Sequence, residues 1–148
     1  MALARLRVML PALWAGMVLC VGLLAAPASF AALPQVEAGR MAAQLFTYEA
    51  HASLAVALFF VMLERRLGGG ALGGNTMLAL AALFCTVAGH FAVQPMMAAA
   101  RAGHGTLDFG TLHGLSVALF ALKGLLLLVL AWRCALPGGV VSSPGQLS

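Results

Sequence analysis

Residues 112–132, LHGLSVALFALKGLLLLVLAW, decide the fold, because this run contains a single residue of the Asp, Glu, Lys and Arg group, Lys123. A run of about twenty apolar residues is the length that an α-helix needs to cross a bilayer. Three more such runs precede it, at residues 8–30, 41–63 and 77–100. The sequence therefore predicts an all-α integral membrane protein, a four-helix bundle that forms a single transmembrane domain over residues 1–148.

The composition agrees with a membrane protein. Hydrophobic residues make up 63% of the chain and charged residues 8%, which is too few for the surface of a soluble domain. The net charge of +4 comes from arginines near the ends of the apolar runs, so it offers no basic face for nucleic acid. Three cysteines, Cys20, Cys85 and Cys134, follow no metal-binding spacing, and their odd number argues against a disulfide framework.

The connections and the two ends of the chain carry further expectations. Pro95 should bend the third helix near its end, and residues 134–148, rich in Pro, Gly and Ser, should form a disordered tail. The first run also resembles a secretory signal peptide with a cleavage region near Ala31. We expect it to be retained, because it is longer than a usual signal core, and the cleaved form is the alternative.

Arginines in the short connections predict the orientation. Those expected on one side of the membrane are Arg5, Arg7, Arg65, Arg66 and Arg133, and those on the other side are Arg40 and Arg101. Because positive residues accumulate on the cytoplasmic side, both termini should be cytoplasmic, in a bacterial inner membrane. Trp14 and Trp132 should then be aromatic anchors at the same headgroup boundary.

Polar side chains inside the apolar runs are the candidate site, since such groups are costly in a bilayer. Counted along each helix at 1.5 Å per residue, the polar groups of three helices reach similar depths. We call this set the polar seam; its candidate members are Gln44, Tyr48, Glu49, His51, His90, Gln94, His113, Ser116 and Lys123.

Glu49 and Lys123 are the charged members of the polar seam. Lys123 lies near the bilayer midplane and needs an internal partner, and Glu49 is the carboxylate within reach. A rotation of 100° per residue turns Glu49 away from His51. We therefore expect a buried Glu49–Lys123 ion pair, with Tyr48 or Gln94 completing its hydrogen bonds.

Several short motifs in order along the chain resemble a known family. They are LWAG at 13–16, APASF at 26–30, AGR at 38–40, LFTY at 45–48, QPMM at 94–97 and LHGLS at 112–116. Together they are similar to the transmembrane protein 205-like family, the domain of unknown function 4149, over residues 13–130. The resemblance implies a small multi-span membrane protein and names no substrate or reaction. Where the family pattern has a polar amide after the fourth-helix His, this chain has Phe120 and Lys123.

The function expected from the sequence is a structural or partner-binding membrane component with a polar seam, in contact with lipid and with a membrane-protein partner or a second copy. The alternative is a small solute, ion or proton transporter that works as an oligomer. A third reading is a haem site between His51 and His90, or a copper(I) site that adds Met96, Met97 or Cys85. No metal or cofactor is expected, because there is no paired His motif and no second-shell pattern. No enzyme activity is expected, because the chain has no HExxH, GxSxG or phosphate-binding loop.

Overall fold

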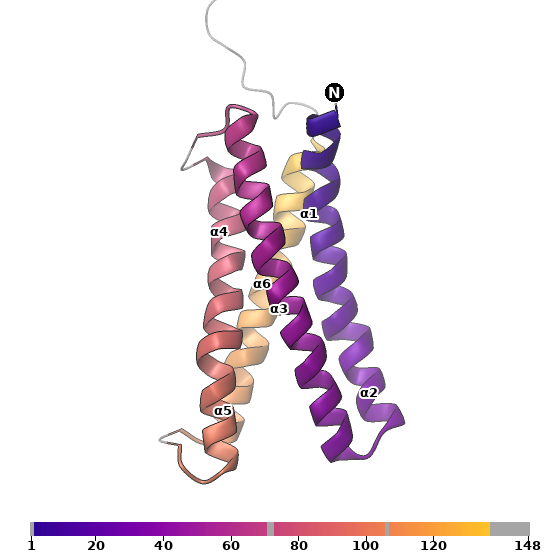
Figure 1. Ribbon diagram of the computed structural model, residues 1–148, viewed down its shortest axis with the longest axis vertical. Coiled ribbons are helices and arrows are strands. Elements are labelled where there is room, and N and C mark those ends of the chain that lie inside the picture. The colour runs from indigo at the N-terminus through magenta and orange to yellow at the C-terminus, as the bar shows by residue number, and fades with distance from the viewer. Residues whose placement is uncertain (1, 71–72, 106, 137–148) are drawn as a thin grey trace, which may run out of the picture.

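The computed structural model describes residues 2–70, 73–105 and 107–136, which form an up-and-down bundle of four long helices (Figure 1). All four are long and apolar enough to cross a membrane, which confirms the predicted four-span, all-α fold. Each of the four helices extends beyond both ends of its predicted apolar run. Their segments are α1 (Ala2–Cys20), η1 (Val21–Ala25) and α2 (Ala26–Ala32); α3 (Gln35–Arg66); α4 (Gly74–Thr86), η2 (Val87–Val93) and α5 (Gln94–Arg101); and α6 (Phe109–Ala135).

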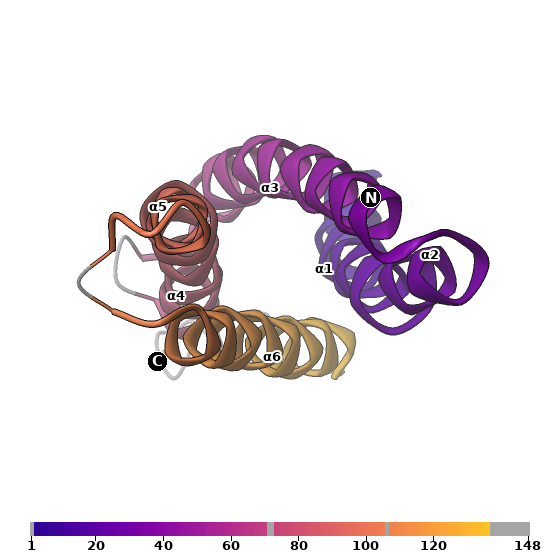
Figure 2. The same cartoon turned by 90° about the horizontal axis from the view of Figure 1, so that it is seen from below.

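The helices form a ring in which α1 packs on α3 and α6, and α4 packs on the same two helices (Figure 2). The N-terminus, the α3–α4 connection and the end of α6 lie together (Figure 1). We call this the arginine-rich end, because it carries Arg5, Arg7, Arg65, Arg66 and Arg133. Arg40 and Arg101 lie toward the opposite end, so the predicted separation of the arginines is confirmed.

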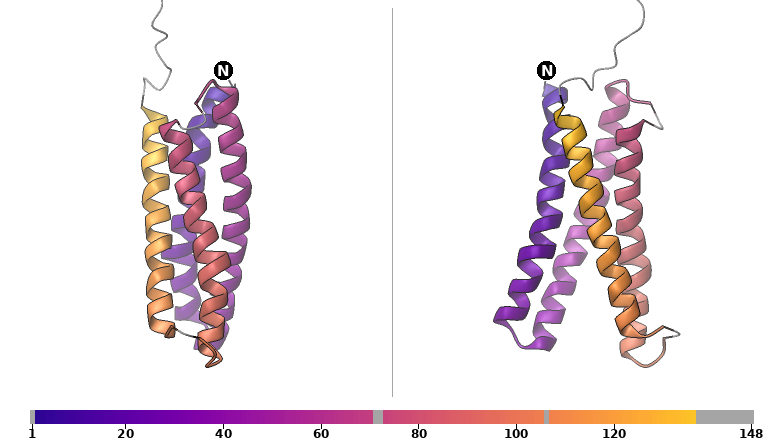
Figure 3. Two further views of the ribbon diagram at one scale, coloured as in Figure 1. Left: turned by 90° about the vertical axis from the view of Figure 1, so that its left-hand side faces the viewer. Right: turned by 180° about the vertical axis from the view of Figure 1, so that it is seen from behind.

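The apolar core lies in the half of the bundle near the arginine-rich end. Its small and branched residues allow close helix packing, as expected where lipid gives no hydrophobic drive for association. The fully packed members are Trp14, Ala15, Val18, Ala57, Phe60, Ala79, Ala82, Leu127, Leu130 and Cys134. Toward the opposite end, α1 and α6 diverge (Figure 3).

The expectation that Trp14 is an aromatic anchor at the headgroup boundary is wrong. Trp14 is only 2% exposed and its indole Nε1 donates to Ser53 Oγ at 2.8 Å, so it belongs to the core and is no headgroup anchor. Counting distance from the helix end could not reveal this, because it does not say which face of the helix turns inward. Trp132 is 70% exposed, as a lipid-facing aromatic residue should be.

Two membrane helices contain a π-helical segment, and a proline follows each one. The amide of Ala26 donates to the Val21 carbonyl and that of Gln94 to the Gly89 carbonyl, five residues back in each case. Pro27 and Pro95 come one residue later, where their missing N–H and their rings would disturb a regular α-helix. The bend expected at Pro95 is thus a wider turn placed before the proline.

The two ends of α6 are both defined. Asp108 is its N-cap and accepts from the Thr111 amide at 2.9 Å and from the Thr111 hydroxyl at 2.6 Å. The hydrogen bond from the Thr111 hydroxyl, and after it the one from the Thr111 amide, lowers the pKa of the exposed Asp108 carboxyl. At the other end α6 continues to Ala135 with Cys134 buried, so the expectation of disorder is wrong for residues 134 and 135. Residues 137–148 of that expected tail lie outside the described part of the chain.

Candidate functional site: a cavity above a buried ion pair

A cavity of about 650 Å³ lies among the four membrane helices, in the half of the bundle toward the opposite end. Figure 2 looks along the bundle from that end and shows how the four membrane helices are arranged around its centre. All four helices contribute lining residues. Glu49 and Lys123 are the deepest charged groups that line it.

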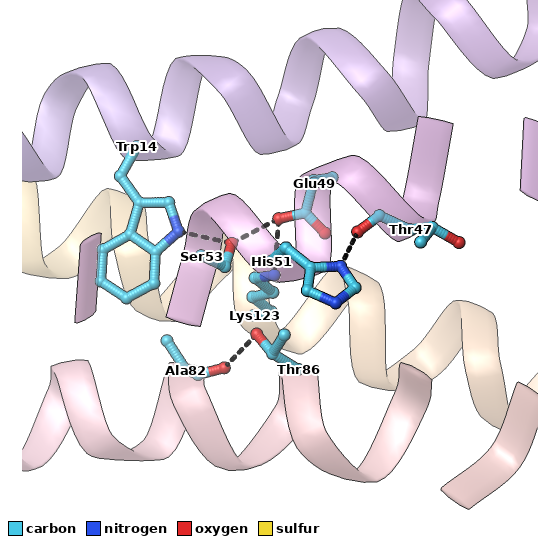
Figure 4. A network of polar contacts seen from close by, with 8 residues as sticks. All are labelled: Trp14, Thr47, Glu49, His51, Ser53, Ala82, Thr86 and Lys123. Carbon is cyan, nitrogen blue, oxygen red and sulfur yellow. Dashed lines mark hydrogen bonds and ion pairs between the residues drawn. The ribbon is translucent and has the colours of Figure 1, made fainter. Parts of the chain in front are cut away.

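Glu49 and Lys123 form the ion pair predicted from the sequence. Lys123 Nζ donates to Glu49 Oε1 at 2.6 Å, and the two side chains are 2% and 3% exposed for Lys123 and Glu49 respectively (Figure 4). The pair joins α3 to α6 across the bundle. Two buried charges are tolerated because each compensates the other and both take part in hydrogen bonds.

Ser53 supplies the additional hydrogen bond, where Tyr48 or Gln94 was expected. Ser53 Oγ donates to the same Glu49 Oε1 at 2.5 Å and accepts from Trp14 Nε1 at 2.8 Å (Figure 4). Ser53 lies one turn after Glu49 on α3 and shares its face, whereas Tyr48 is 64% exposed on another face. Hydrogen bonds therefore connect α1, α3 and α6 at one level of the membrane.

An aromatic layer lies one turn from the ion pair, on the side of the opposite end. Phe46 precedes Glu49 by three residues, Phe120 precedes Lys123 by three, and their rings pack edge to face with centroids 5.1 Å apart. Gly22 of η1 completes the layer, because a Cβ there would overlap the Phe120 ring. The two rings shield one side of the ion pair, which explains how a charged pair beside a cavity stays so fully buried.

The walls of the cavity differ in chemistry. Every lining residue from the first membrane helix is apolar, and α3 contributes only Glu49 as a polar group. The third helix and α6 provide the remaining polar lining, which consists of Thr86, His90, Gln94, Arg101, His113, Ser116 and Lys123. The cavity thus has an apolar wall on one side and a polar wall on the other.

Arg101 is the second cation of the polar wall. Its guanidinium lies 4.5 Å from the centroid of the Phe109 ring, and Phe109 stacks in turn on His113 at 5.8 Å. Stacking on an aromatic face orients a guanidinium and leaves its N–H edge available. Among the described residues, Arg101 has no carboxylate within salt-bridge distance.

The polar seam predicted from the sequence is divided by the structure. Six of its members line the cavity: Glu49, His90, Gln94, His113, Ser116 and Lys123. The other three, Gln44, Tyr48 and His51, are exposed on α3 and do not line it. Gln44 donates to the Tyr48 hydroxyl at 2.8 Å, and His51 Nδ1 donates to the Thr47 carbonyl at 2.7 Å (Figure 4).

His51 and His90 approach each other where α3 packs on η2. Their ring centroids are 6.1 Å apart with the planes at 73°, and Phe91 packs against both rings at 6.0 Å and 4.9 Å. Within residues 2–70, 73–105 and 107–136, no group of three His, Cys, Asp or Glu could hold a metal ion.

Four contributors to the site were not expected from the sequence: Ser53, Phe46, Gly22 and Arg101. Ser53 had a detectable signal, since it follows Glu49 by four residues and must share its helix face. The others had none, because an apolar residue or a helix-end arginine has no pattern that separates a cavity wall from a lipid-facing surface.

A family model described as "Domain of unknown function (DUF4149)" matches residues 9–105. The match covers the first three membrane helices, including Glu49, and ends before α6, which carries Lys123. It confirms the resemblance to the domain of unknown function 4149. It does not test the transmembrane protein 205-like label, and it does not reach the motif at 112–116. Comparison with curated proteins and with solved structures gives no match.

Proposed function

The chain belongs to the DUF4149 family, whose description names no activity, and we propose from its cavity that the protein binds a small molecule inside the membrane. The cavity of about 650 Å³ carries this proposal. Pockets for small molecules are typically about 300–1,000 Å³, mainly apolar, with a few polar groups placed to orient the ligand. Such a site supports the transporter alternative more than a purely structural role, and the proposal contains no catalytic step.

The location proposed is a bacterial inner membrane with both termini cytoplasmic. The separation of the arginines supports this orientation, because positive residues favour the cytoplasmic side. The cavity then faces the external side. We further propose that the first membrane helix is retained, since Trp14 is buried and bonded to Ser53 of α3.

A cavity-filling variant tests the binding function. Gly89 lines the cavity, and the nearest atom to an added Cβ is a carbon of Leu119 at 3.9 Å, an ordinary van der Waals contact, so Gly89→Leu adds a side chain beside the cavity without a clash at its Cβ. Gly114 is the matched control, because it is exposed, does not line the cavity and has nothing within 4 Å of an added Cβ.

Native mass spectrometry of protein extracted from its own membranes in mild detergent provides the measurement. The wild type and Gly114→Leu should retain the same small-molecule adducts, and Gly89→Leu should lose most of them. Equal adducts in all three proteins, or adducts in none, would contradict the proposal. Far-ultraviolet circular dichroism confirms that each variant is folded.

A second candidate function, binding a membrane-protein partner or a second copy, rests on a different surface. Tyr48 is 64% exposed and forms with Gln44 and His51 a polar strip on the outside of α3. Polar groups on a lipid-facing surface are typical of helix–helix contacts in membranes. This strip lies outside the cavity, so the two functions are compatible.

Cross-linking tests this interface. In a Cys20→Ser background, Tyr48→Cys should give a specific cross-linked band with a short bis-maleimide in native membranes. Leu58→Cys is the control, since Leu58 is also 64% exposed on α3 and lies further along the helix. The same yield of cross-linked product at both positions would indicate random collision and exclude an interface at the polar strip.

A further inference from the structure

We infer that the ligand of this cavity is a single-chain amphiphile with an anionic headgroup. This inference rests on the proposed binding function and adds the chemical class of the ligand. The first observation is the division of the cavity into two walls. A purely polar solute would make no apolar contacts with the apolar wall. A purely apolar solute would cover His90, Gln94 and Ser116 without giving them hydrogen-bond partners.

The charge of the polar wall selects an anion. Lys123 and Arg101 contribute two positive charges, and Glu49 contributes the one negative charge among the described lining residues. Glu49 is bonded to Lys123, so its charge is already compensated. Arg101 remains, oriented on the Phe109 ring, and guanidinium is the side chain best suited to bind carboxylate or phosphate.

The position of Arg101 gives the headgroup a definite place. It is the last residue of α5, so it lies at the end of the cavity nearest the membrane surface. His113 lines the cavity on α6, and its ring stacks on the same Phe109 ring that Arg101 covers. A headgroup bound to Arg101 would stay at headgroup depth while its chain extended into the bundle.

The cavity opens toward lipid between the first membrane helix and α6. Leu23 on η1 and Leu125 and Leu128 on α6 line the cavity, yet they are 68%, 61% and 44% exposed. Figure 3 shows α1 and α6 moving apart toward the opposite end. An acyl chain could therefore enter sideways from the bilayer without leaving an apolar environment.

The length of the cavity fits one chain. From His113 to Leu125 is twelve residues of α6, or about 18 Å at 1.5 Å per residue, which is close to the extended length of a chain of about sixteen carbons. The cavity volume of about 650 Å³ lies within the range of about 300–1,000 Å³ that is typical of a pocket for one small ligand. The geometry thus favours a single-chain compound.

Photolabelling tests the inference with a defined probe. The probe is a hexadecanoic acid that carries a diazirine near its methyl end, added to full-length protein in zwitterionic lipid nanodiscs. Peptide mass spectrometry should find the label on η1 and on the middle of α6, near Leu23 and Leu125. Unlabelled hexadecanoate and hexadecyl phosphate should both compete, whereas hexadecanol should compete roughly tenfold less and hexadecyltrimethylammonium not at all.

Two variants locate the headgroup. Arg101→Gln should reduce labelling roughly tenfold, as expected for loss of a charge-assisted hydrogen bond. Arg40→Gln is the control, because Arg40 is also exposed near the same end and does not line the cavity. Equal losses in both variants would show that the effect is general membrane electrostatics and would overturn the assignment of Arg101.

The outcomes separate this inference from the proposed function. Labelling of the cavity helices with preferred competition by hexadecanol or by the cationic amphiphile would refute the anionic class and leave a binding cavity. Competition by only one of the two anions would restrict the headgroup to carboxylate or to phosphate. Labelling that is unchanged in Gly89→Leu would refute both the ligand class and the cavity as a binding site.

Discussion

Replacing Lys123 by Met should destabilise the protein severely, because it leaves the Glu49 carboxylate buried without a counter-charge. In the structure Glu49 is 3% exposed at its side chain and its Oε1 accepts from both Lys123 and Ser53. After the substitution only the Ser53 hydroxyl remains. Removing one partner of a buried ion pair costs about 3–5 kcal/mol, a factor of about 10² to several thousand in the folded-to-unfolded ratio.

Glu49→Gln should cost less than Lys123→Met. The amide oxygen of Gln can still accept from Lys123 and Ser53, but it provides no negative charge. The double variant Glu49→Gln/Lys123→Met removes both charges, and replacing both partners of a buried pair can be nearly neutral. We expect it to recover at least half of the stability lost in Lys123→Met.

The free energy of unfolding can be measured by titration with sodium dodecyl sulfate in mixed micelles. With Trp132→Phe as background, the fluorescence of Trp14 reports the transition, and Trp14 is bonded to Ser53 within the same network. Arg133→Ala is the control; its side chain is exposed and should contribute within about 0.5 kcal/mol. Losses that add up in the double variant would mean that the two charges act independently, and this account of the ion pair would be wrong.

Three further predictions concern orientation, packing and pH. Reporter fusions after Arg66 and at the C-terminus should read cytoplasmic and a fusion near Gly103 external; a periplasmic C-terminus would reverse the proposed orientation. Gly22→Ala should cost about 1–3 kcal/mol by pushing the Phe120 ring, and Phe120→Ala in the same chain should relieve that strain, whereas no relief would place the strain elsewhere. Because the pKa of Asp108 is lowered, the stability that its cap contributes is present above the unfolded carboxyl pKa of about 4 and is lost as pH falls through the folded pKa. Amide exchange in the first turn of α6 should therefore rise at acid pH relative to Asp108→Asn. The same dependence of exchange on pH in both proteins would refute this.

The bundle could be predicted from the sequence because its determinants are local. Long apolar runs can satisfy backbone hydrogen bonds in lipid only as helices, so four runs give four spans. The Glu49–Lys123 pair was also predictable, since a lysine near the midplane has few ways to be stabilised.

The facing of the helices was harder to predict. In a soluble helix, polar residues mark the outside, but in lipid the apolar residues cover both faces, so the pattern does not separate Tyr48 on the surface from Glu49 in the core. The same ambiguity hid the burial of Trp14. The position and lining of the cavity were not predictable, because it lies where α1 and α6 diverge, and helix crossing angles depend on packing between distant residues.

The π-helical turn η2 sets the angular phase of everything that follows it on the third membrane helix. A π turn takes in one more residue than an α turn, so the helix beyond it is rotated by about 100° from its uninterrupted course. Met97 and Arg101 lie beyond that turn and line the cavity. Deleting one residue from η2 would restore the regular phase and turn Arg101 toward lipid, so the place of Arg101 in the polar wall depends on a single residue of helix length.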